Sequence, residues 1–160
     1  MSKPMSKIQP RKRLIVFDID GTLSDVTHRE RFAKDKDYET FYSLMSKDSP
    51  RREVVDLLLS FHNLRNVCTD NLCIVILTGR PCKYETETVK WIEKHTGLKE
   101  HEDYILIMRE NGDYRNDGIF KNEIIELLQN GIGDIAFMID DRESVIKTIE
   151  RKTTIKVIQA

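Results

Sequence analysis

The sequence has little that would place the protein in a membrane or outside the cell. It contains no hydrophobic run of membrane-spanning length, and no secretory apolar segment precedes its first candidate strand. Cysteine is scarce as well, because Cys68, Cys73 and Cys82 are odd in number and follow no recognised spacing. We therefore expect no membrane contact, reduced thiols and a cytoplasmic location.

An excess of charge of either sign is also lacking. The chain has 26 basic and 27 acidic residues and a formal net charge of −1, so it offers no broad basic surface for duplex nucleic acid. Contact with a charged substrate should therefore be local. The length of 160 residues predicts one compact domain over residues 13–160, preceded by a basic flexible tail over residues 1–12.

The most informative feature is an apolar run over residues 14–17 that leads into Asp18 and Asp20, with glycine and threonine behind them. A buried strand that ends in this way can present one carboxylate as a nucleophile and the other as a proton donor. An ordinary turn after aspartate stays open as an alternative for this segment alone. A calcium loop fails, because Val26 and Arg29 occupy its ninth and twelfth positions.

A second apolar run, residues 72–77, ends in Thr78, Gly79 and Arg80. The hydroxyl, the free backbone amides and the planar guanidinium of such a segment can hold phosphate oxygens. Taken alone, the segment is more often a strand followed by a turn.

A third run, residues 135–139, ends in Asp140 and Asp141. Like charges at a strand end are costly unless a cation neutralises them, and a set of oxygen ligands favours Mg²⁺. Lys121, at the start of an apolar-periodic stretch, could point toward the same place. A lone lysine is otherwise expected at the surface.

Short apolar runs alternate with helical patterns, and strands are expected near residues 13–17, 72–77, 104–108, 135–139 and 155–158. Helices are expected from Ser49-Pro50 onward, over residues 84–96 with Gly97 as the stop, and over residues 142–150. This alternation predicts an α/β, Rossmann-like domain of three layers with a five-stranded parallel sheet. Ligands then bind beyond the carboxyl ends of the strands.

Residues 24–48 are charged and few, so we expect a short helical flap inserted after the first strand, too small for a closed lid. An open site of this kind admits the end of a polymer. The aromatic residues Tyr38, Phe41 and Tyr42 could stack on a base or pack the flap onto the body. His28 could face the pocket or lie at the surface.

The order of these segments resembles that of the haloacid dehalogenase-like phosphohydrolase superfamily over residues 14–158. Within it, the likeness is greatest to the 3'-phosphatase domain of bacteriophage polynucleotide kinase-phosphatase. The likeness rests on Arg29, on Thr-Gly-Arg at 78–80, on the string from Arg109 to Lys121, and on Asp140-Asp141-Arg142. In that family, the positions that serve the phosphatase match Asp18, Asp20, Arg29, Arg80, Asp117, Lys121, Asp140 and Asp141.

The resemblance implies a covalent mechanism. Asp18 would attack phosphorus to form an aspartyl-phosphate, and Asp20 would protonate the leaving hydroxyl and then deprotonate the attacking water. Thr78 and Lys121 would hold the transferring oxygens.

Mg²⁺ is the implied cofactor, with Asp18, Asp140 and the backbone carbonyl of Asp20 as its ligands. The cation would offset charge between the nucleophile and the phosphate. Asp141 and Asp117 would orient metal-bound water or the nearby lysine.

The implied substrate is a 3'-phosphate at the end of a polynucleotide, DNA or RNA. Arg29 and Arg80, with the backbone of Gly79, would bind the phosphate or the nucleotide behind it. A soluble nucleotidase that acts on nucleoside monophosphates is the alternative function. A non-catalytic phosphate-binding module is a more distant one, because such a module would be expected to lack Asp18 or Asp20.

One departure from the family bears on partners. The kinase half of the family carries a phosphate-binding loop of the form G-x-x-x-x-G-K-[ST], which this sequence lacks. We therefore expect no kinase domain, and a separate kinase or ligase as a partner is left open.

Overall fold

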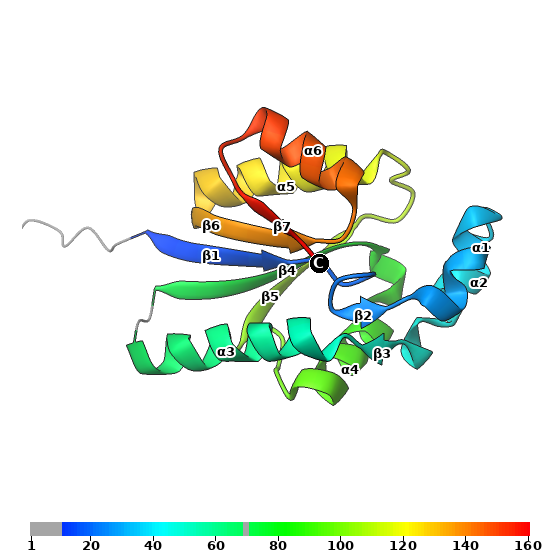
Figure 1. Cartoon of the computed structure of the whole chain (residues 1–160), viewed down its shortest axis with the longest axis horizontal. Helices are drawn as coiled ribbons and strands as arrows, with labels where there is room; N and C mark the ends of the chain where they lie inside the picture. Colours follow the sequence, from blue (N-terminus) through cyan, green and yellow to red (C-terminus); the bar gives the residue numbers. More distant parts are fainter. Residues whose placement is uncertain (1–10, 69–70) are drawn as a thin grey trace, which may run out of the picture.

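The computed structural model describes residues 11–68 and 71–160, so most of the expected tail lies outside the described residues. Five strands form one parallel sheet in the order β5-β4-β1-β6-β7, as Figure 1 shows. Their bounds are β1 (Lys12–Phe17), β4 (Leu72–Pro81), β5 (Tyr104–Arg109), β6 (Gly133–Asp140) and β7 (Val157–Gln159). The predicted α/β domain with a five-stranded parallel sheet is confirmed, although β7 begins later than expected.

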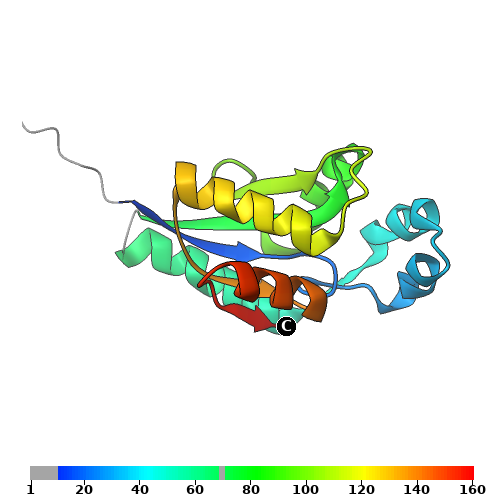
Figure 2. The same cartoon turned by 90° about the horizontal axis from the view of Figure 1, so that it is seen from above.

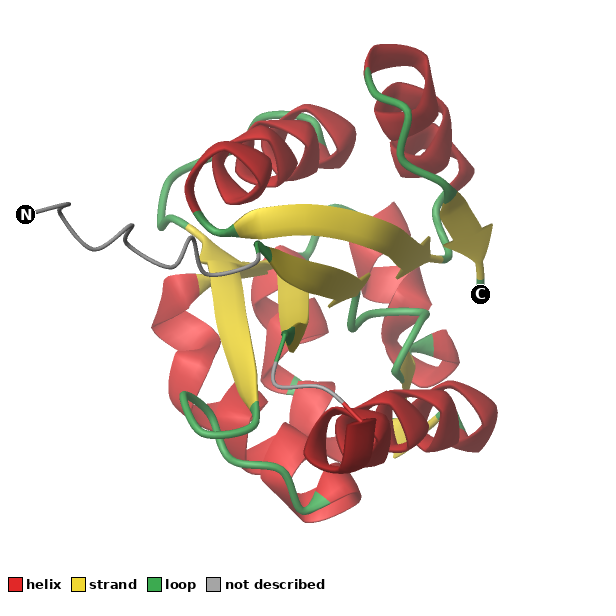
Figure 3. Cartoon of the chain, turned by 90° about the vertical axis from the view of Figure 1, so that its left-hand side faces the viewer, coloured by secondary structure: helices red, strands yellow, loops and turns green. Residues whose placement is uncertain are grey.

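Four long helices cover the two faces of the sheet (Figures 1 and 3). α3 (Arg52–Cys68) and α4 (Glu85–Thr96) lie on one face, and α5 (Asp117–Gly131) and α6 (Glu143–Lys152) lie on the other. Successive residues of a strand point to opposite faces. Ile15 of β1 therefore joins the core beside α3 and α4, while Leu14 joins the core beside α5 and α6.

Two of the expected helix ends test the sequence signals directly. Gly97 ends α4 in a left-handed conformation with a φ of 74°, as predicted. The expectation that Ser49 and Pro50 begin a helix is wrong, because they form the short strand β3 (Ser49–Pro50) and α3 begins after it. β3 pairs antiparallel with β2 (Ser24–Asp25), and this extended pairing suits the φ angle that the proline ring imposes.

The insertion between β2 and β3 is a small helical flap, as predicted. It consists of η1 (Thr27–Arg29), α1 (Glu30–Lys34), α2 (Tyr38–Ser43) and η2 (Met45–Lys47). Figures 1 and 2 show it as a separate lobe beyond the carboxyl ends of the strands. Because β2 and β3 pair at its base, the flap is held at both of its ends.

No helix within residues 11–68 and 71–160 is both long and apolar enough to cross a membrane. Cys73 and Cys82 are free thiols, and burial raises the pKa of both. The side chain of Cys68 lies outside the described part of the chain. A cytoplasmic location remains a prediction.

Candidate active site

Asp18 lies at the carboxyl edge of the sheet, where its carboxylate contacts a buried lysine. Asp18 follows β1 directly, and its backbone N–H donates to the Ile139 carbonyl of β6 at 3.0 Å. Lys121 of α5 is buried, and its Nζ donates to Asp18 Oδ1 at 2.8 Å and to Asp140 Oδ2 at 2.7 Å. The structure thus brings together three predicted site residues that lie far apart in the sequence.

Burial and neighbouring charges shift the pKa values in this group. Burial raises the pKa of Asp18, while Lys121 opposes the rise and Asp140 reinforces it. Burial alone would lower the pKa of Lys121, but the surrounding carboxylates outweigh it, so that pKa is raised. Lys121 is therefore a fixed positive charge that balances part of the carboxylate charge.

Three carboxylates beside this lysine could hold a divalent cation. Oxygens of Asp18, Asp140 and Asp141 lie within 4.8 Å of one another. Asp141 Oδ1 is buried and has no hydrogen-bond partner within the described part of the chain, and a cation would satisfy it while offsetting the crowded charge. These oxygen ligands therefore fit the expected Mg²⁺. The Asp20 carboxylate is not a member of the group, so its backbone carbonyl as a ligand stays a prediction.

Asp20 is held by two buried arginines. Arg29 Nη2 and Arg80 Nη2 each donate to Asp20 Oδ1 at 2.6 Å, and both arginine side chains are 0% exposed. Burial alone would raise the pKa of Asp20, but the charges and hydrogen bonds of the two arginines hold this pKa well below its usual range. Asp20 is therefore a carboxylate here, the form in which it can accept a proton.

The guanidinium groups of Arg29 and Arg80, which we expected to bind phosphate, are engaged with carboxylates. Besides Asp20, both contact Asp48, from Arg29 Nη2 at 2.6 Å and from Arg80 Nη2 at 3.3 Å. Phosphate contact by these two arginines remains a prediction. Their position supports a role in orienting Asp20.

Asp48 is a residue of this network that the sequence analysis did not identify. Its buried carboxylate lies 2.8 Å from His28 Nε2, and its backbone carbonyl accepts a hydrogen bond from Trp91 Nε1 at 2.9 Å. His28 therefore faces the network. A single aspartate at the end of a charged flap carries no local signal. The one available indication is that two buried arginines require a second carboxylate besides Asp20 to neutralise their charge.

Asp117, at the start of α5, links Lys121 to the end of β4. Its Oδ1 accepts a hydrogen bond from Arg109 Nη2 at 2.6 Å, and its Oδ2 lies 3.2 Å from Lys121 Nζ. Gly79 of β4 passes so close that a Cβ on it would overlap Asp117 Oδ1. Thr78, the preceding residue, is buried. Asp117 thus positions Lys121, while phosphate contacts by Thr78 and Gly79 stay predictions.

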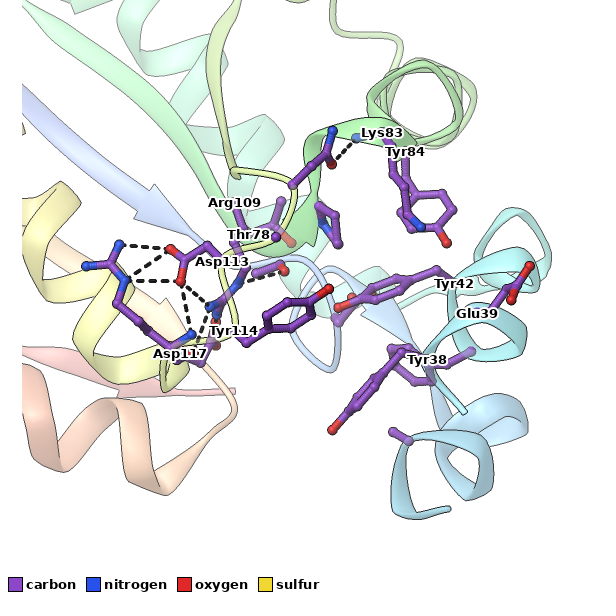
Figure 4. A pocket seen from close by; sticks show the side chains of 18 of the residues that line it. Tyr38, Glu39, Tyr42, Thr78, Lys83, Tyr84, Arg109, Asp113, Tyr114 and Asp117 are labelled. Carbon is purple, nitrogen blue, oxygen red and sulfur yellow. Dashed lines mark hydrogen bonds and ion pairs between the residues drawn. The ribbon is translucent and has the colours of Figure 1, made fainter. Parts of the chain in front are cut away.

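These groups open into a cavity of about 670 Å³ between the flap and the carboxyl edge of the sheet. Figure 4 shows that tyrosines of the flap and of the loop before α5 line it. Asp18, Asp20 and Thr78 also belong to its lining. Arg115 and Arg142, both about half exposed, add positive charge to its lining. A cavity of this size suits a nucleotide-sized group.

Comparison with known proteins agrees with this geometry. A family model described as the phosphatase domain of polynucleotide kinase PNKP matches residues 12–160. A protein of Autographa californica nuclear polyhedrosis virus, named as a bifunctional polynucleotide kinase/RNA ligase, is 27% identical over 135 residues. That match covers 84% of this chain, and the chain spans only 17% of the length of the viral protein.

Two solved structures share the fold. A chain of the Pnkp1/Rnl/Hen1 RNA repair complex has a TM-score of 0.75 at 23% identity, over 94% of this chain and 42% of that chain. A class C acid phosphatase from Bacillus anthracis with tungstate bound has a TM-score of 0.60 at 18% identity, over 96% of this chain and 68% of that chain. Both likenesses concern the fold alone.

Proposed function

Because the chain belongs to the family of polynucleotide kinase phosphatase domains and is a phosphatase, we propose that it removes the 3'-phosphate from polynucleotide ends with the help of Mg²⁺. The observation that carries this proposal is the buried Asp18 carboxylate, paired with Lys121 and facing a cavity that is open to solvent. A nucleophile and a fixed positive charge therefore lie side by side where a phosphate would enter.

The covalent steps use Asp18 and Asp20. An oxygen of Asp18 attacks phosphorus, and the bond from phosphorus to the 3'-oxygen breaks. The leaving oxygen receives its proton through Asp20, which must first accept that proton from solvent or from the bound phosphate monoester, because the two arginines hold Asp20 deprotonated. Water then attacks the aspartyl-phosphate, Asp20 takes a proton from that water, and Asp18 and inorganic phosphate are released. The deprotonated Asp20 held by the two arginines has the form required for the second step.

The remaining residues hold the phosphate and the charge. Lys121 donates toward the transferring oxygens, and Asp117 keeps the lysine in place from 3.2 Å. Asp18, Asp140 and Asp141 would hold Mg²⁺, which supplies positive charge between nucleophile and phosphate when it is bound.

The end of a polynucleotide is the substrate that the open site favours. The flap is only two short α-helices and two 3-10 turns, and it leaves the cavity accessible at its rim rather than enclosing it. Arg115 and Arg142 line the cavity and are about half exposed, which supports contact with phosphates of a strand that leaves the site. The viral relative carries polynucleotide kinase and RNA ligase in its name, so we also propose that a kinase or ligase acts on the same ends.

The test is a substrate panel in the presence of Mg²⁺. 3'-phosphorylated DNA and RNA oligonucleotides should exceed 3'- and 5'-mononucleotides in kcat/KM, because contacts remote from the reacting bond contribute to the rate. If 5'-mononucleotides outrun every 3'-phosphorylated oligonucleotide, the nucleotidase function is selected instead. The catalytic roles of Asp18 and Asp20 would then be unaffected.

A further inference from the structure

Three tyrosines face one another across the cavity from two separate parts of the chain. Tyr38 and Tyr42 belong to α2 of the flap, and Tyr114 belongs to the loop between β5 and α5. The Tyr114 residue is 95% exposed and Tyr38 is 54% exposed. Figure 4 shows the Tyr114 ring reaching toward the Tyr42 side chain, with Tyr38 beside them.

The exposed ring of Tyr114 stands on a loop that hydrogen bonds hold in place. Arg109 Nη1 donates to the Arg115 carbonyl at 2.7 Å, and Arg115 Nη2 donates to Asp113 Oδ2 at 2.8 Å. Earlier in the same loop, Asn111 Oδ1 accepts a hydrogen bond from the Lys83 amide at 2.9 Å. The loop is therefore fixed on both sides of Tyr114, and its aromatic ring is presented to the cavity at the cost of leaving apolar surface in water.

The tyrosines of the flap differ in their packing. Phe41, between them in sequence, is buried inside the flap, where the Arg29 guanidinium lies 4.1 Å from its ring centroid. Tyr42 rests against Tyr84, with ring centroids 5.0 Å apart. Within the described part of the chain, neither Tyr38 nor Tyr114 makes a ring contact with another aromatic side chain.

We propose that Tyr114 and Tyr38 form a base clamp, in which they stack on the base of the nucleotide whose 3'-phosphate lies against Asp18, with Tyr42 as the adjoining wall. This clamp rests on the proposed function. The rings lie in the same cavity as Asp18, whose volume of about 670 Å³ accommodates a nucleotide. Because every base has an aromatic face, stacking would accept any terminal base without reading sequence.

The test uses Tyr114, whose exposure makes its removal harmless to the core. Tyr114→Ala should lower kcat/KM for a 3'-phosphorylated oligonucleotide about tenfold, mainly through KM, which is the size of one lost base stack. It should leave kcat/KM for glycerol 2-phosphate, which carries no aromatic group, unchanged. Tyr114→Phe and Tyr114→Trp should retain wild-type rates, because either ring can stack. Leu127→Ala, which removes an exposed apolar side chain that does not line the cavity, is the control.

A substrate whose terminal nucleotide lacks its base tests whether the Tyr114 ring stacks on that base. The wild type should lose about tenfold on this abasic end, and Tyr114→Ala should add no further loss. An equal loss by Tyr114→Ala on abasic and base-bearing ends, or no loss on either, overturns the clamp and leaves the ring to another role such as contact with a protein partner.

Failure of the clamp and failure of the proposed function give different results. If the wild type prefers 5'-mononucleotides, the proposed function fails. The clamp is then judged by comparing a nucleoside 5'-monophosphate with ribose 5-phosphate in the wild type and in Tyr114→Ala. If the wild type prefers 3'-phosphorylated oligonucleotides but shows no dependence on the terminal base, only the clamp fails.

Discussion

At the scale of single residues, the site consists of buried charges, each of which is neutralised by oppositely charged neighbours. Lys121 is surrounded by carboxylates, and Asp20 is surrounded by guanidinium groups. An ion pair of this kind adds little stability in itself, but removal of one partner leaves the other charged and buried. The consequences of mutation therefore differ between residues that react and residues that neutralise.

Asp18→Asn tests the reacting residue. The amide is nearly isosteric with the carboxylate but is a poor nucleophile, so turnover should fall by at least about a thousandfold while the fold is retained. Steady-state kinetics and circular dichroism measure the two effects. The wild type should also form a beryllofluoride adduct that the variant does not form. Substantial turnover by Asp18→Asn would contradict covalent catalysis.

Asp48→Ala tests a neutralising residue. Arg29 and Arg80 would keep their charges without one of their two carboxylate partners, so the free energy of unfolding should fall by about 3–5 kcal/mol. Urea denaturation measures this change. Asp134→Ala removes a carboxylate from the exposed pair with Arg11 and should cost less than about 1 kcal/mol. Equal losses of unfolding free energy in the two variants would show that the buried network contributes no more to stability than an exposed ion pair does.

At the scale of elements, the site depends on how the end of β4 meets the start of α5. Gly79 lies against Asp117, which in turn contacts both Arg109 and Lys121. This junction sets the position of Lys121, since the lysine and Asp117 lie one turn apart on the same helix. A Cβ at residue 79 would overlap the Asp117 carboxylate, which would have to shift.

Gly79→Ala tests this junction. The added methyl group would displace the Asp117 carboxylate, and Lys121 would move with it, so kcat should fall about tenfold to a hundredfold. Gly131→Ala is the matched control, because a Cβ at that glycine meets no atom within 4 Å. Similar kcat values for Gly79→Ala, Gly131→Ala and the wild type would show that the close contact does not position Lys121.

For the whole molecule, the main consequence of the architecture is that three carboxylates from two strands meet at one edge of the sheet. Asp18 follows β1, and Asp140 and Asp141 come at the end of β6, the neighbour of β1. Their repulsion opposes folding in the absence of a counter-charge. Binding of a divalent cation should therefore stabilise the folded chain as well as support its activity.

Addition and removal of metal test this coupling. Mg²⁺ at a hundredfold excess over its Kd should raise the free energy of unfolding by about 2.7 kcal/mol and raise Tm. A strong chelator should abolish turnover, and Ca²⁺ should restore it poorly because it is larger and less strict in geometry. Asp140→Ala should lose the Tm response to Mg²⁺. Activity that persists in the chelator would rule out the metal.

The sequence alone was sufficient to predict the parallel sheet and the residues at its carboxyl edge. Hydrophobic runs that end in polar groups are local signals, and parallel topology brings the ends of successive strands to one edge. Asp18, Thr78 and Asp140 could therefore be assigned to one site. The start of α3 was misplaced because Ser49 and Pro50 carry a helix-start signal that pairing with β2 overrides.

Only the tertiary structure decided which charges neutralise which. The hydrogen bonds that engage Asp48 and Asp20 join residues that are 19 and 60 positions apart in the chain, and they exist only where the fold brings these residues together. No local pattern encodes such a choice, because a guanidinium can pair equally well with a phosphate or with a carboxylate. The same holds for Tyr38 and Tyr114, whose shared cavity exists only in the folded chain. Local composition determined the chemistry that is present, and packing determined where each charge and each ring is directed.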